Sequence, residues 1–188
     1  MDKYANSTIE EVFNLAIKNH QTKNFNVAKD LYKQVLAINP NHMQALNNLG
    51  IILVQFKEYQ EAISCYEKAI RIDPKFAGGY NNIGIIFKTL GESRQAITFY
   101  EKAIEIDPNY TEALYNLGIV LQELREDEKA KDYYKKVIEI DPNYSKALNN
   151  LGVIFEELKE HQKAKEFYEK AIKIDPNFAV AYYNLASI

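Results

Sequence analysis

The sequence predicts an all-α protein in which a pair of helices is repeated every 34 residues. The first observation behind this prediction is the spacing of the prolines, since all five are 34 residues apart: Pro40, Pro74, Pro108, Pro142 and Pro176. The second is a row of small residues at the same spacing: Ala16, Gly50, Gly84, Gly118, Gly152 and Ala186. The third is that apolar residues recur three and four positions apart within each period, which is typical of amphipathic helices.

Three further rows of residues recur at the same 34-residue spacing and support the repeat assignment. A large apolar row directly precedes the small one: Leu15, Leu49, Ile83, Leu117, Leu151 and Leu185. An alanine row comes later in each period: Ala28, Ala62, Ala96, Ala130 and Ala164. A tyrosine row lies four residues beyond it: Tyr32, Tyr66, Tyr100, Tyr134 and Tyr168.

Each period divides into two helices, which in the second period are expected at about residues 43–56 and 59–71. The residue before each proline is disfavoured in the helical conformation, so a turn is expected there. A glycine inside a helix costs about 1 kcal/mol relative to alanine. We therefore expect the paired helix to approach the glycines closely, opposite the alanine row.

These rows resemble the tetratricopeptide repeat (TPR) family, whose 34-residue signature combines Leu-Gly, aromatic residues, Ala and a closing Pro. The resemblance covers Ile9 to Ile188, and the array is most similar to the TPR superhelix of O-GlcNAc transferase-like proteins. It implies a right-handed α-α superhelix (solenoid) of five helical hairpins plus one extra C-terminal helix. The first helix of each hairpin is then expected to line the concave side.

The elements are expected in the following order. Residues 1–8 form a leader and helix cap, in which Ser7 and Glu10 can form a capping box. The five repeats and the final helix are expected at residues 9–42, 43–76, 77–110, 111–144, 145–178 and 179–188. The last segment, a truncated sixth repeat, has no charged residue. Either the chain is a piece of a longer protein, or this uncapped helix associates with a second copy.

Composition excludes several classes of function. The net charge is −3, so a nucleic acid partner is not expected. The sequence has no run of about 18 apolar residues, so it predicts no membrane span. Cys65 is the single cysteine, which excludes an internal disulfide and a thiolate cluster. A cytoplasmic location is expected.

No arrangement of residues predicts catalysis, a metal or another cofactor. His20, His42 and His161 occupy unrelated places in the period, and none is three or four residues from a cysteine or another histidine. The glycines follow no strand that would suit a phosphate-binding loop. We therefore expect a protein that is not an enzyme.

The candidate binding site is a row of asparagines, each of which precedes a residue of the large apolar row. Its members are Asn14, Asn48, Asn82, Asn116, Asn150 and Asn184. A carboxamide both donates and accepts hydrogen bonds, so a ladder of them can pair with the backbone of an extended peptide. In the alternative reading, the asparagines satisfy backbone groups of the adjacent repeat.

Two rows flank the asparagines. The position before them holds mixed residues, among them Asn47, Asn81, Tyr115 and Asn149. Three residues after them a β-branched row includes Ile51, Ile85 and Ile119. This second row is either an apolar stripe for ligand side chains or packing between successive helices.

Three functions remain open on the sequence. The first is a protein- or peptide-binding scaffold that holds an extended segment in its concave groove. The second is the substrate-presenting TPR region of a larger glycosyltransferase-like enzyme. The third is a self-assembling oligomeric scaffold that uses the uncapped C-terminal helix.

Overall fold

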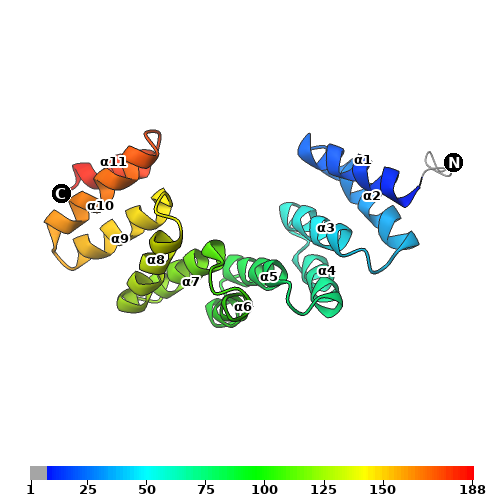
Figure 1. Ribbon diagram of the computed structural model, residues 1–188, viewed down its shortest axis with the longest axis horizontal. Helices are drawn as coiled ribbons and strands as arrows, with labels where there is room; N and C mark the ends of the chain where they lie inside the picture. Colours follow the sequence, from blue (N-terminus) through cyan, green and yellow to red (C-terminus); the bar gives the residue numbers. More distant parts are fainter. Residues whose placement is uncertain (1–7) are drawn as a thin grey trace. The chain divides into compact units, whose positions relative to one another are not determined.

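The computed structural model describes residues 8–188, and within that range the chain forms eleven α-helices and no strand (Figure 1). The helices are α1 (Ile9–Gln21), α2 (Phe25–Ile38), α3 (Met43–Gln55), α4 (Tyr59–Ile72), α5 (Ala77–Thr89), α6 (Ser93–Ile106), α7 (Thr111–Glu123), α8 (Asp127–Ile140), α9 (Ser145–Glu157), α10 (His161–Ile174) and α11 (Ala179–Ala186). The predicted fold class, an all-α array of helical hairpins with one extra helix, is confirmed. The helices expected in the second period agree with α3 and α4 to within one residue.

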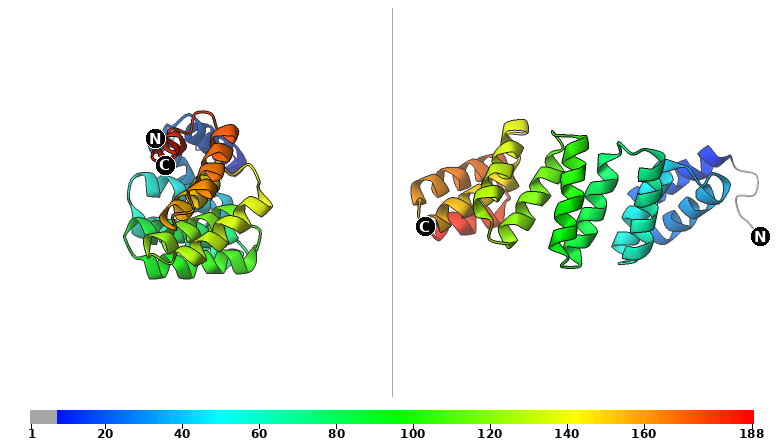
Figure 2. Two further views of the ribbon diagram at one scale, coloured as in Figure 1. Left: turned by 90° about the vertical axis from the view of Figure 1, so that its left-hand side faces the viewer. Right: turned by 90° about the horizontal axis from the view of Figure 1, so that it is seen from below.

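The chain divides into two compact units, and the boundary falls after Gly91, in the turn that follows α5. In the first unit the helices α1 to α4 each pack against the helix that follows. In the second unit the same holds for α6 to α10. Figure 2 gives two further views of these hairpins. Each unit therefore has a continuous core that forms between neighbours in sequence, as repeat proteins require.

The Asp-Pro pairs end the second helix of a repeat through an Asx turn. Asp73, for example, is the extended C-cap of α4, and its Oδ1 accepts a hydrogen bond from the Lys75 backbone N–H at 2.9 Å. Asp107, Asp141 and Asp175 make the same contact two residues on, and so does Asn39. A short side-chain acceptor at this position mimics a backbone turn, and the proline prevents the helix from continuing.

The N-cap of the first helix lies one residue later than predicted. Ser7 lies outside the described residues, and α1 starts at Ile9, so the N-cap is Thr8. Thr8 Oγ1 accepts from Glu11 N at 3.2 Å, and Glu11 Oε2 accepts from Thr8 N at 2.8 Å. The capping box therefore pairs Thr8 with Glu11, and the predicted Ser7–Glu10 pair is wrong.

The glycine row is explained by the tyrosines rather than the alanines. A Cβ added to Gly50 or Gly118 would lie 2.6 Å from Cε1 of Tyr66 or Tyr134, respectively. Gly152 meets Tyr168 in the same way. The expected close approach of the paired helix is present, but the side chain that needs the space is the fully buried tyrosine ring.

The turn between the two helices of each repeat contains one residue with positive φ. These residues also recur every 34 positions: Lys23 (61°), Lys57 (60°), Gly91 (78°), Arg125 (62°) and Lys159 (60°). Only glycine adopts this conformation without a steric penalty, so four of the five turns hold a disfavoured side chain.

Candidate functional site: the asparagine rows

The asparagine row lies on the first helix of each repeat, in both units. Asn14, Asn48 and Asn82 belong to the first unit, and Asn116, Asn150 and Asn184 belong to the second. Asn14 is exposed, and the other five are half-buried. Half-burial means that part of each of these five residues remains accessible to solvent.

Two of these asparagines donate to tyrosine hydroxyls of the preceding repeat. Asn48 Nδ2 is 3.2 Å from Tyr32 Oη. Asn150 Nδ2 is 3.2 Å from Tyr134 Oη and 3.4 Å from Tyr115 Oη. Hydrogen bonds thus connect the asparagine row to the buried tyrosine row.

Two others donate to an asparagine of the preceding repeat. Asn82 Nδ2 is 3.3 Å from Asn47 Oδ1, and Asn184 Nδ2 is 3.0 Å from Asn149 Oδ1. Asn47 and Asn149 stand at the flanking position that Tyr115 occupies in its own repeat. The flanking residue of one repeat therefore provides a hydrogen-bond acceptor for the asparagine of the next repeat.

These contacts fix the orientation of four of the six carboxamides. The Nδ2 groups of Asn48, Asn82, Asn150 and Asn184 are used within the protein, and their partners are side chains rather than the backbone groups considered in the alternative reading. Each Oδ1 has two lone pairs, of which at most one is used by the neighbouring flanking asparagine. These four asparagines therefore present oriented hydrogen-bond acceptors.

The flanking residues are buried to different degrees. Asn81 and Asn149 are each only 4% exposed, while Ile51, Ile85 and Ile119 are half-buried. Val153, which continues the β-branched row, packs against the buried Phe155, Ala164 and Tyr168. This row contributes to the core and also retains some accessible apolar surface.

An aromatic cluster recurs at equivalent positions in the two units. In the first unit the ring of Phe13 lies 4.4 Å from that of His42 and 6.0 Å from that of Tyr32. In the second unit Tyr115 lies 5.0 Å from Tyr144 and 5.8 Å from Tyr134. In the sequence, Tyr115 stands out only as a flanking residue of the asparagine row, and Phe13 occupies the same position in the first repeat. Comparison of the repeats three periods apart could have found both clusters.

The buried tyrosines form hydrogen bonds in addition to filling the core. Tyr134 Oη donates to Gln122 Oε1 at 2.9 Å, and Tyr168 Oη donates to Glu156 Oε2 at 2.7 Å. Burial raises the pKa of both hydroxyls above the ordinary value of 10.0. Burial, reinforced by the charge of nearby acidic groups, raises the pKa of Tyr144 to about 12. The tyrosine row therefore remains neutral in the folded chain well above neutral pH.

The described part of the chain, residues 8–188, contains no group of three His, Cys, Asp or Glu side chains placed to hold a metal ion. In the same range no helix is long and apolar enough to cross a membrane. Burial raises the pKa of the half-buried Cys65 thiol. A raised pKa lowers the thiolate fraction at neutral pH, so this thiol is a poor nucleophile.

Comparison with known proteins agrees with the repeat pattern. The tetratricopeptide repeat family matches four stretches of the chain: residues 44–76, 77–110, 111–144 and 145–178. The chain belongs to the TPR family. No curated protein sequence matches it significantly.

Several solved structures share the TPR fold of this chain. A crystal structure of MamA is 27% identical, with a TM-score of 0.75, and the match covers 87% of this chain and 96% of MamA. YrrB, described as a TPR protein with an unusual peptide-binding site, is 24% identical, with a TM-score of 0.69, covering 96% and 93%. PilF of Pseudomonas aeruginosa is 20% identical, with a TM-score of 0.79, covering 95% and 87%. The closer resemblance to O-GlcNAc transferase arrays stays a prediction.

Proposed function

We propose that this TPR array is a protein-binding scaffold whose first-helix faces hold extended peptide segments. The observation that carries the proposal is the fixed orientation of four asparagine carboxamides, those of Asn48, Asn82, Asn150 and Asn184. Their Nδ2 groups are held by the preceding repeat, so their Oδ1 atoms are available to accept from backbone N–H groups of a ligand. Because these acceptors are already ordered, binding them costs little conformational entropy.

The flanking residues have two roles in this proposal. The buried Asn81 and Asn149 position the row from below, as the contact from Asn184 to Asn149 illustrates. The half-buried Ile51, Ile85 and Ile119 supply apolar contacts for ligand side chains. Backbone recognition gives affinity, and apolar pockets beside it give selectivity.

The test begins with a peptide selected from a random display library against residues 1–188. Its affinity is then measured for the wild type and for the Asn48→Ala and Asn82→Ala variants, which both lie in the first unit. We expect each substitution to weaken binding by about three- to tenfold, the equivalent of one net hydrogen bond.

The matched control is Asn177→Ala, which removes an exposed asparagine from a turn instead of a first helix. Its affinity should equal that of the wild type. Urea unfolding of each variant separates lost binding from lost folding. Unchanged affinity of both first-helix variants, measured on folded protein, would mean that the asparagines are purely structural.

A further inference from the structure

Two grooves lie at equivalent places in the two units, three repeat periods apart. The groove in the first unit has a volume of about 480 Å³ and is lined by Pro40, Asn41, Lys68, Arg71 and Ile72. The groove in the second unit, of about 620 Å³, is lined by Pro142, Asn143, Leu148, Lys170, Lys173 and Ile174. Apart from Leu148, each residue of the second groove is the equivalent of one in the first. The same groove therefore forms in both units, including the first, in which α5 follows it.

Part of each groove is the turn that precedes a first helix. In the second unit the backbone N–H of Asn143 donates to Asp141 Oδ1 at 3.0 Å. In the first unit the backbone N–H of Asn41 donates to Asn39 Oδ1 at 3.1 Å. These hydrogen bonds order the backbone of the turn, whereas the residues Asn41 and Asn143 are themselves exposed. Each groove thus has an ordered polar wall with an accessible carboxamide.

The apolar part shared by the two grooves is the isoleucine that ends the second helix of a repeat. Ile72 is 41% exposed, and Ile174 is half-buried. Ile174 packs against a core cluster that contains Leu148 and Ala171. Because core packing holds this side chain in place, the groove offers an ordered aliphatic surface to an apolar side chain of a ligand.

The second helix contributes two cations to each groove, and the lining contains no carboxylate. These exposed cations are Lys68 and Arg71 on α4, and Lys170 and Lys173 on α10. The members of each pair are three residues apart, a spacing that places both side chains on one face of the helix. Within residues 8–188 none of the four forms an ion pair. Two like charges at this spacing repel each other, and an anion bound between them would relieve the repulsion.

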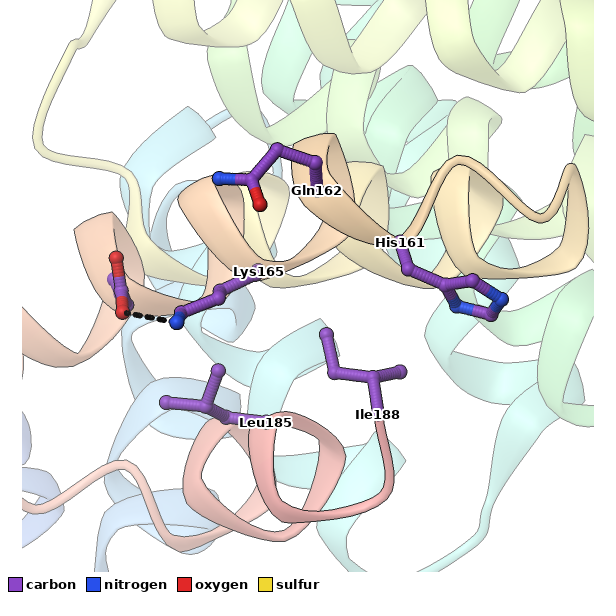
Figure 3. Close-up of a pocket in the computed structure, with 6 residues that line it drawn as sticks. His161, Gln162, Lys165, Leu185 and Ile188 are labelled. Atoms are coloured by element: carbon purple, nitrogen blue, oxygen red, sulfur yellow. Dashed lines mark ion pairs between the residues drawn. The ribbon is translucent and has the colours of Figure 1, made fainter.

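The basic pair is specific to the second and fifth repeats. The fourth repeat has Lys136 and Glu139 at the equivalent positions, so it combines one cation with one carboxylate. The groove between α10 and α11 is also compensated, because Lys165 pairs there with Glu169 at 3.9 Å (Figure 3). The two grooves at the turns between repeats differ from both places, since their positive charge has no acidic partner.

We propose that each of these two grooves binds an acidic peptide segment of a partner protein, in which carboxylates flank an aliphatic side chain. The carboxylates pair with the two cations, the aliphatic side chain contacts the isoleucine, and the carboxamide of the turn forms hydrogen bonds with the peptide backbone. The apolar contact distinguishes such a segment from a phosphate group, which would use the cations alone. The net charge of −3 disfavours a nucleic acid. The grooves use no residue of the asparagine row, so the inference does not depend on the proposed peptide-binding function.

The probe is a synthetic peptide with a central leucine that is flanked on each side by a pair of glutamates. It is titrated into the isotopically labelled 188-residue chain, and the NMR shifts of the backbone amides of Asn41 and Asn143 report the affinity of each groove separately. In the Lys173→Glu variant we expect the affinity reported by Asn143 to fall about tenfold, while that reported by Asn41 is unchanged. Arg71→Glu should show the reverse pattern. Glutamate is compatible with the fold at this position, since Glu139 occupies it in the fourth repeat.

The matched control is Lys135→Glu, which makes the same charge change at an exposed lysine of α8 that lines neither groove. Both affinities should then equal those of the wild type. Absence of binding, or a Lys173→Glu variant that binds like the wild type at Asn143, would overturn the proposal. So would inorganic phosphate that shifts the same amides with the affinity of the peptide, because the apolar contact would then contribute nothing. A dimer of the chain that dissociates in the Lys173→Glu variant would also overturn it, because a second copy would then occupy the groove.

Discussion

At the scale of single residues, the buried tyrosine hydroxyls connect the core to the candidate binding surface. Tyr134 donates to Gln122 and accepts from Asn150, so its hydroxyl links the two helices of one repeat to the first helix of the next. Tyr100 is equally buried, but within residues 8–188 its hydroxyl has no hydrogen-bond partner. The same residue type at the same repeat position therefore contributes differently to stability.

The substitution Tyr134→Phe should lower the free energy of unfolding by about 1–2 kcal/mol, because it removes two hydrogen bonds, to the half-buried Gln122 and from the half-buried Asn150. Tyr100→Phe is the matched control. It removes a buried hydroxyl that has no partner, and should be neutral or slightly stabilising. Urea unfolding of both variants measures the difference, and equal losses would contradict this account of the hydroxyl contacts.

The sequence predicted the asparagine row but could not predict the direction of each carboxamide. That direction depends on the flanking residue one repeat earlier, which is an asparagine before Asn82 and a tyrosine before Asn150. The glycine row could likewise be predicted only in part. A small residue could be assigned to a close approach, but whether Tyr66 or Ala62 fills the space follows from how the two helices are turned relative to each other.

At the scale of elements, the turns within the repeats combine a strict geometry with unfavourable side chains. Lys23, Lys57, Arg125 and Lys159 adopt positive φ, and Gly91 is the one glycine among the five equivalent turns. The 34-residue spacing of these residues is visible in the sequence. Their conformation is not, because lysine and arginine do not by themselves signal a left-handed backbone.

Replacing Lys57 with glycine should raise the free energy of unfolding by up to about 1 kcal/mol, because glycine adopts positive φ without steric penalty. The converse change, Gly91→Ala, should lower it by about 1 kcal/mol. Thermal or urea unfolding of the two variants provides the test. A Gly91→Ala variant as stable as the wild type would show that the turn conformation carries no penalty.

The packing of the two helices in a repeat limits the size of the side chain at the glycine position. Gly118→Val places a branched side chain against the buried ring of Tyr134 and should destabilise the chain by about 2–3 kcal/mol. The control is Gly78→Ala, where the added Cβ would meet the ring of the half-buried Phe76 at 3.0 Å. We expect the control to change the midpoint of urea unfolding much less, and equal shifts would argue against close packing as the reason for the glycine row.

At the scale of the whole molecule, the regularity of the repeat explains why the fold could be predicted and the sites only in part. Five periods of proline, alanine and tyrosine, with glycine in four of the small-residue positions, specify the hairpins with little ambiguity. The aromatic clusters around Phe13 and Tyr115 were not predicted, since they appear only when rings in repeats three periods apart are compared. The division after Gly91 also has no clear signal in the repeat pattern.

The tyrosine row should make the chain sensitive to alkali. Burial raises the pKa of Tyr66, Tyr100, Tyr134 and Tyr168 above the value of 10.0 for an exposed tyrosine. Above pH 10 the unfolded chain therefore loses protons that the folded chain retains, and stability falls as the pH rises, by up to about 1.4 kcal/mol per pH unit for each such tyrosine. Below pH 10 these groups should contribute no pH dependence.

Urea unfolding between pH 8 and pH 11.5 measures this effect. The Tyr66→Phe variant should show a shallower loss of stability above pH 10 than the wild type, since it has one fewer buried hydroxyl to titrate. Identical slopes for the two proteins would mean that Tyr66 does not contribute.

The central claim is that ordered asparagine carbonyls on the first helices bind the backbone of an extended ligand. The most direct test is an N-methyl scan of a library-selected peptide, in which each backbone N–H is replaced in turn while every side chain is kept. The account predicts that methylation at several positions weakens binding about three- to tenfold each, and that this loss is much smaller in the variant lacking the opposing asparagine. Equal tolerance of methylation at all positions, with only side-chain substitutions affecting the affinity, would contradict it.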